Sequence, residues 1–177
     1  NESMAQIVIF TSCAIGCVLL STIAADFIAK PLVERWRPSS DPLIKYAVDV
    51  VDDYRPGKYG FFSAHAANTF SLALYFSLWV KNRLFSFAMI SWSLLNCYSR
   101  IYLGAHYPSD VVVGLLVGAV IAVLFYLLSR KLFFKISSNF NYVSTQYSAT
   151  GYSVTDIDMV LTVIGFLYIL IIIIPLL

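Results

Sequence analysis

Charged residues are scarce in this sequence. Lys, Arg, Asp and Glu make up 12% of its 177 residues, whereas a soluble domain carries about 25%. Hydrophobic residues make up 59%, and several apolar runs are long. This combination excludes an ordinary soluble domain and predicts an integral membrane protein in contact with the bilayer. The net charge of +2, without a basic tract or a base-stacking motif, predicts that nucleic acid is not a partner.

Cysteine and histidine are also few. Cys13, Cys17 and Cys97 lie inside apolar segments, and an odd number so placed excludes a disulfide framework. Cys13 and Cys17 share a helix face, but two thiols without a nearby histidine or acid make a poor metal site. The sequence lacks a Walker loop, a zinc-binding histidine pair and a carboxylate cluster for magnesium. We therefore expect no metal and no cofactor.

Five apolar segments are long enough, at about 20 residues each, to cross about 30 Å of hydrocarbon as helices. They cover residues 4–28, 61–80, 84–103, 111–128 and 159–177. The predicted fold is an all-α, polytopic transmembrane helical bundle that forms a single domain over residues 1–177. Gly114 and Gly118 form a small-xxx-small face, which predicts close helix packing in the fourth segment.

Two polar loops separate these segments. Residues 29–60 form the first, which is too long for a tight turn, and long loops in compact domains are often functional. A short helix is predicted within it over residues 43–51, with Asp41 near its start. Residues 136–156 form the second polar loop, on the opposite face, and carry no chemical signature. The sequence carries no signal for an oligomeric state.

Several charged residues near the first loop have simple interpretations. Asp26, in the last turn of the first segment, is either an interfacial acid or a partner for Lys30 four residues later. Cations near helix ends commonly snorkel or set topology. That interpretation is assigned to Arg35, Lys45, Arg55 and Lys58.

Polar residues gather at the ends of four apolar segments. Successive spans cross the membrane in opposite directions, so the end of one segment and the start of the next lie at the same face. Alternation therefore places seven side chains at one surface: Lys30, Arg37, Ser63, His65, Arg100, His106 and Asp110.

The chemistry available to this set is restricted. One Lys and two Arg can hold a phosphate and stabilise developing charge. His106 and Asp110, four residues apart, can meet, so the carboxylate accepts one imidazole N–H and the other nitrogen becomes a nucleophile. His65 is then available as a general acid. The sequence predicts a metal-independent phosphotransfer through a phosphohistidine.

Three short patterns resemble the three motifs of the type 2 phosphatidic acid phosphatase family. They are Lys30-x6-Arg37-Pro38, Ser63-Ala64-His65 and Ser99-Arg100-x5-His106-x3-Asp110. That family shares its catalytic core with vanadium haloperoxidases and bacterial acid phosphatases. The second pattern departs from the family, which usually has Pro and Gly where this chain has Phe62 and Ala64. The motifs span residues 30–110, roughly half of the chain.

The resemblance implies roles for these residues. His106 attacks phosphorus, Asp110 orients it, and His65 protonates the leaving group. Phosphate oxygens are bound by a further set, to which the Ala64 backbone contributes: Lys30, Arg37, Ser63, Ala64 and Arg100. Family members typically have six spans, so five spans and a start at Asn1 predict either a lost N-terminal piece or a shorter member. Such enzymes usually act at the outer face of the bacterial inner membrane.

The predicted function is therefore hydrolysis of a phosphomonoester or pyrophosphate on a lipid. Candidate substrates are phosphatidic acid, phosphatidylglycerophosphate, undecaprenyl pyrophosphate and lipid A. Two alternatives stay open from the sequence. One is a lipid phosphotransferase that uses the same residues, and the other is a non-catalytic protein that binds or transports an anionic lipid.

Overall fold

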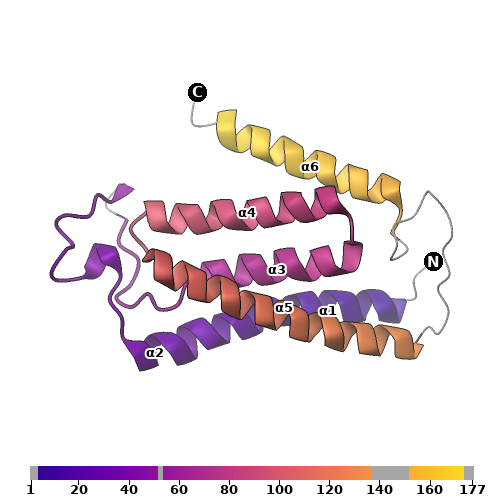
Figure 1. Ribbon diagram of the computed structural model, residues 1–177, viewed down its shortest axis with the longest axis horizontal. Coiled ribbons are helices and arrows are strands. Elements are labelled where there is room, and N and C mark those ends of the chain that lie inside the picture. The colour runs from indigo at the N-terminus through magenta and orange to yellow at the C-terminus, as the bar shows by residue number, and fades with distance from the viewer. Residues whose placement is uncertain (1–3, 52–53, 137–151, 174–177) are drawn as a thin grey trace.

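The computed structural model describes residues 4–51, 54–136 and 152–173. Five long helices account for most of these residues: α1 (Met4–Thr22), α3 (Ala64–Val80), α4 (Arg83–Tyr102), α5 (Pro108–Ile136) and α6 (Val154–Ile173) (Figure 1). Short elements follow α1: the π-helix η1 (Ile23–Ala29), α2 (Lys30–Val33) and the 3-10 helix η2 (Pro38–Ser40). No strand forms in this part of the chain, and the prediction of an all-α bundle is confirmed. Most of the predicted polar loop 136–156 lies outside the described residues.

Within the described residues, three helical runs are by length and composition suited to cross a membrane: Met4–Val33, Pro108–Phe133 and Val154–Ile171. Helices α3 and α4 fill the second and third predicted segments, with 17 and 20 residues. Several boundaries differ from the prediction: α3 begins at Ala64, α5 runs from Pro108 to Ile136, and α6 already begins at Val154.

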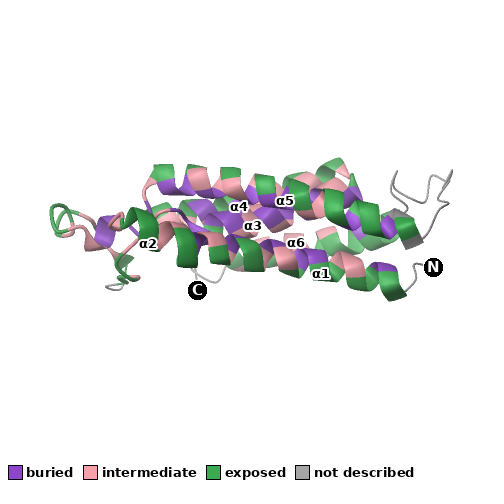
Figure 2. Ribbon diagram, turned by 90° about the horizontal axis from the view of Figure 1, so that it is seen from below, coloured by how far each residue is buried: buried purple, intermediate pink, exposed green. Residues whose placement is uncertain are grey.

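Helix α3 lies at the centre of the bundle. It packs against α1, α4 and α5, and its buried positions follow most of its length (Figure 2). A Cβ atom added to Gly114 of α5 would lie 2.7 Å from the Ser63 carbonyl oxygen, and one added to Gly118 would lie 2.6 Å from that of Ala67. The backbones of α3 and α5 therefore approach as closely as the small-xxx-small pattern predicts.

The predicted helix over residues 43–51 is wrong. Residues 42–47 form turns, which Asp41 begins by accepting a 3.0 Å hydrogen bond from the Leu43 N–H. Leu43 and Tyr46 are 91% and 89% exposed, so no packing stabilises a helix here. Short helices without tertiary contacts are marginal, and the segment remains a series of turns.

The turn between α4 and α5 is tied to the first polar loop. Gly104 has φ +61°, a left-handed conformation that costs glycine little. Its carbonyl oxygen accepts a 3.1 Å hydrogen bond from the Ser39 N–H. The loop after α2 is thereby held beside the residues that begin α5.

Candidate active site

The predicted site residues lie at one end of the bundle. This end is formed by α2, the loop that follows it, the first turns of α3 and α5 and the last turn of α4 (Figure 1). At the centre is His106, which is only 3% exposed.

Arg37 contacts the Nε2 side of the His106 ring. Its Nη1 lies 3.2 Å from Nε2 and also donates to the Ala105 carbonyl oxygen at 3.1 Å. Its Nε donates to the Tyr59 carbonyl oxygen at 3.1 Å. Because a guanidinium can only donate, Nε2 accepts. This assigns the imidazole proton to Nδ1 and leaves an Nε2 lone pair, the form a nucleophile requires.

Asp110 lies on the other side of the ring. Its Oδ2 is 3.9 Å from His106 Nδ1, beyond hydrogen-bond distance, and Nδ1 has no partner among the described residues. The i, i+4 spacing thus places the carboxylate beside Nδ1, one small shift from contact.

The surroundings of His106 keep its imidazole neutral. Burial first, and then the positive charges of Arg37 and Lys30, lower the pKa of His106 to about 3. At neutral pH the ring is therefore uncharged, and the cations at this end of the bundle reinforce that state. Burial is also the main cause that lowers the pKa of Arg37.

Arg35 is the residue that the sequence interpretation missed. Its Nη1 donates to Asp110 Oδ1 and to Ser109 Oγ, both at 2.8 Å, whereas the sequence suggested only a topological role. A usable signal was present. Residues two apart in an extended segment point to the same side, so Arg35 could have been grouped with Arg37, directly before Pro38.

Lys30 forms an ion pair with Asp26, which supports the partner interpretation of that acid over the simple interfacial one. Both side chains line a pocket of about 530 Å³. Arg37, Lys58 and Tyr59 also line it, and Glu34 contributes a second acid. The pocket thus gives a ligand access to two of the three predicted phosphate-binding cations.

The second motif lies at the start of α3. Ser63 is fully buried, and its Oγ caps the helix by accepting from the Ala66 N–H at 3.4 Å. The Ser63 N–H donates to the Asp110 carbonyl oxygen at 3.1 Å, which joins the starts of α3 and α5. His65 is exposed, and it lies within electrostatic range of Arg100, Lys30 and Arg37. Arg100 itself donates to Ser99 Oγ at 3.2 Å.

The two departures from the second motif have packing roles. Phe62 and Ala64 are 5% and 7% exposed and form a buried cluster with Ala25 and Ala67. Phe62 therefore fills space between η1 and α3 next to the predicted site.

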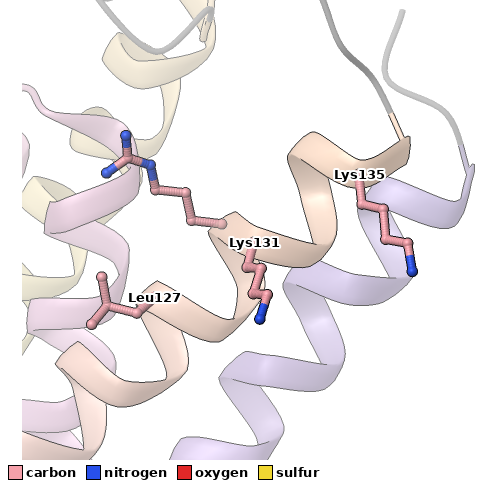
Figure 3. A pocket seen from close by; sticks show the side chains of 4 residues that line it. Leu127, Lys131 and Lys135 are labelled. Carbon is pink, nitrogen blue, oxygen red and sulfur yellow. The ribbon is translucent and has the colours of Figure 1, made fainter.

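A second basic pocket lies at the opposite end of α5. Leu127, Arg130, Lys131 and Lys135 line it, and its volume is about 530 Å³. The side chains of Lys131 and Lys135 extend to the same side of α5 (Figure 3). None of its lining residues is a histidine or an acid, so it lacks the groups for nucleophilic or acid–base catalysis. In the described residues, no three His, Cys, Asp or Glu side chains are grouped to hold a metal.

Comparison with known proteins places the chain in a family. The PAP2 superfamily profile matches residues 11–134. The chain is 36% identical over 132 residues to a lipid A 4'-phosphatase of Bacteroides thetaiotaomicron, covering 72% of the chain and 59% of that protein. It is 40% identical over 111 residues to a lipid A 4'-phosphatase of Porphyromonas gingivalis, covering 60% and 47%.

A more distant relative is sphingosine-1-phosphate phosphatase 1 of Rattus norvegicus, 33% identical over 94 residues, which cover 52% of the chain and 22% of that protein. The chain spans about half the length of the two lipid A 4'-phosphatases. No solved structure matches it.

Proposed function

The chain belongs to the PAP2 superfamily, and we propose that it is an integral membrane lipid phosphatase that works through a phosphohistidine. The observation that carries the proposal is the environment of His106. A buried, neutral imidazole has Arg37 at Nε2 and the Asp110 carboxylate beside Nδ1. This arrangement suits a nitrogen nucleophile beside a phosphate-binding cation.

In the proposed first step, the lipid phosphate binds between the cations, and Arg37 moves from His106 Nε2 to donate to the phosphate oxygens. Nε2 then attacks phosphorus, and the bond between phosphorus and the lipid oxygen breaks. His65 gives its proton to the departing lipid oxygen. The Nδ1 proton stays on the ring, directed at Asp110, whose negative charge offsets the positive charge that develops on the imidazole.

In the second step, water attacks the phosphohistidine. His65 accepts a proton from that water, the bond between phosphorus and Nε2 breaks, and inorganic phosphate leaves. The phosphoryl oxygens are held in both steps by Lys30, Arg37, Ser63 and Arg100, with the Ala64 backbone N–H. These donors stabilise the negative charge that develops on the phosphoryl oxygens.

The substrate class is proposed from the relatives. The names of two relatives specify removal of a phosphate from lipid A, and that of a third specifies sphingosine 1-phosphate. These substrates are phosphomonoesters, which favours a lipid phosphomonoester over undecaprenyl pyrophosphate, with lipid A first among the four candidates. We place the enzyme in a bacterial inner membrane with the His106 end facing outward. This end would meet lipid headgroups while the tails remain between apolar helices.

The direct test is phosphate release by the purified full chain in detergent, assayed with the four candidate lipids. His106→Ala should lower turnover at least about 1000-fold and leave the unfolding temperature within a few degrees. Lys45→Gln, which removes a cation from the same loop away from the site, should keep wild-type turnover. Turnover of the wild-type enzyme should persist in chelator. Wild-type turnover in His106→Ala would contradict the proposal, and a strict magnesium requirement would contradict its metal-free form.

A second measurement addresses the intermediate. Rapid quenching with radiolabelled lipid phosphate should trap an acid-labile, base-stable label on the wild-type protein and none on His106→Ala. Equal labelling of both proteins would place the nucleophile elsewhere.

A further inference from the structure

We propose that Arg35 is a positioning residue for the nucleophile, acting on His106 through Asp110. The inference deepens the proposed function and rests on it. Arg35 occupies one of the six unspecified positions between Lys30 and Arg37 of the first motif.

The two oxygens of the Asp110 carboxylate have different partners. Oδ1 accepts from Arg35 Nη1 at 2.8 Å. Oδ2 accepts from the Tyr107 N–H at 3.1 Å and faces His106 Nδ1 at 3.9 Å. Because a carboxylate is planar, these two contacts fix its orientation, and Oδ2 remains directed at the imidazole.

Arg35 also compensates the charge of Asp110. The Asp110 side chain is 0% exposed, whereas that of Arg35 is 38% exposed and reaches solvent. A buried carboxylate without a partner is costly and tends to take up a proton. His106 cannot supply the compensating charge, because its own ring is neutral. Arg35, together with the Tyr107 N–H, therefore favours the ionised carboxylate, which can accept a hydrogen bond from Nδ1–H.

Arg35 is itself held in place. Its guanidinium lies 4.4 Å from the centroid of the Tyr107 ring and donates to Ser109 Oγ at 2.8 Å. Its carbonyl oxygen accepts from the Gly60 N–H at 2.9 Å. The Tyr107 hydroxyl in turn donates to Asp41 at 3.1 Å. These contacts direct Arg35 at α5, in contrast to Arg37, whose Nη1 points at the nucleophilic nitrogen.

The orientation and the charge of the Asp110 carboxylate matter when His106 attacks phosphorus. Nδ1 must approach Oδ2 by about 1 Å to form a hydrogen bond, and this bond stabilises the positive charge that develops as Nε2 bonds to phosphorus. A carboxylate that rotates or becomes protonated cannot make it. Loss of Arg35 should therefore slow the chemical step, with little change in lipid binding.

The test compares Arg35→Gln with Lys45→Gln in steady-state assays of the full chain on the lipid that the wild-type enzyme turns over fastest. Arg35→Gln should lower kcat roughly 10- to 100-fold and change KM less than about threefold. The acid limb of its kcat profile should move to higher pH, because Asp110 then protonates more readily. Arg35→Lys, which restores the charge, should recover part of kcat and of the profile. Lys45→Gln should match the wild type.

Two further variants separate positioning from a structural role. Ser109→Ala removes one contact of Arg35 and should lower kcat a few-fold with the same direction of pH shift, which keeps the test available if Arg35→Gln does not fold. In an Asp110→Asn background, Arg35→Gln should cause no additional loss, because both changes remove the same interaction. A rise in KM with an unchanged pH profile would overturn the proposal in favour of direct phosphate binding. A lower unfolding temperature with unchanged kcat would reduce Arg35 to a structural role.

A spectroscopic measurement is independent of turnover. The chain has two histidines, so ¹⁵N-histidine labelling gives two imidazoles, and His65→Asn assigns them. Because Arg37 holds His106 in the Nδ1–H tautomer in both proteins, we expect the His106 Nδ1 signal to shift in Arg35→Gln as the neighbouring Asp110 carboxylate turns or takes up a proton. An unchanged Nδ1 signal would overturn the role of Arg35. Absence of lipid phosphatase activity in the wild type would instead overturn the proposed function.

Discussion

At the scale of single residues, burial determines what His106 can do. An exposed histidine titrates close to neutral pH. His106 is only 3% exposed, and its pKa falls to about 3. Arg37 reinforces the neutral state of the imidazole, because its N–H can donate only to an Nε2 that carries a lone pair. The ring therefore keeps a lone pair on Nε2, while its Nδ1 lies 3.9 Å from the Asp110 carboxylate.

This burial predicts how stability depends on pH. The pKa of His106 lies below that of an unfolded histidine, about 6.5, so the unfolded state binds more protons between these values and stability falls as pH falls. From pH 6.5 to pH 5 the loss should reach at most about 2 kcal/mol. His106→Gln removes this contribution, so its unfolding temperature in detergent should fall less than that of the wild type between pH 7.5 and 5. Equal falls would show that His106 titrates normally in the folded protein.

At the scale of elements, the contact between α3 and α5 positions two of the three motifs. Gly114 and Gly118 let α5 approach the first turns of α3, and the hydrogen bond from the Ser63 N–H to the Asp110 carbonyl oxygen joins the two helix starts. The distance between the Ser63 motif and the His106 motif therefore depends on the absence of two side chains within the bundle.

Gly118→Ala should consequently destabilise the protein by about 1–3 kcal/mol, the usual cost of overpacking. Gly165→Ala in α6 is the matched control, because a Cβ there meets nothing within 4 Å and the change gains helix propensity. Thermal unfolding of both variants in the same detergent measures the difference. If Gly118→Ala were as stable as Gly165→Ala, close packing of α3 against α5 would be unimportant.

At the scale of the whole molecule, charged residues are separated into two groups, one at each end of the bundle. One end holds the His106 site and the pocket lined by Lys30 and Arg37, and the other holds the basic pocket of Arg130, Lys131 and Lys135. Helix α5 has 29 residues, which corresponds to about 43 Å at 1.5 Å per residue and exceeds the hydrocarbon thickness of about 30 Å. Both ends can therefore reach the headgroup layers of one bilayer.

The separation predicts labelling from opposite sides of the membrane. The native thiols of Cys13, Cys17 and Cys97 are buried at 6%, 0% and 4% exposure, so they should react slowly. A membrane-impermeant maleimide added to right-side-out vesicles should label Lys45→Cys before lysis and Lys131→Cys only after it. The opposite order would reverse the proposed orientation, and labelling of both before lysis would contradict a spanning α5.

The sequence by itself determined the helical class, the five apolar segments and the motif residues, because periodicity, length and side-chain chemistry are local properties. It also indicated the close packing at Gly114 and Gly118 and offered the Asp26–Lys30 pair as one of two alternatives, since both follow from spacing along one helix. The expected helix over residues 43–51 failed because helix formation there needed a packing partner that the fold does not provide.

Only the tertiary structure decided which side chains meet across long separations in the chain. Arg35 reaches Asp110 across 75 residues, and Arg37 reaches His106 across 69. The tautomer of His106 depends on these contacts and on burial, and neither is encoded in a motif. The same physical reason explains why the sequence could suggest His106 as the proposed nucleophile but missed the arginine beside Asp110. The chemistry of a side chain can be read from its residue type, whereas its contacts depend on how the chain folds.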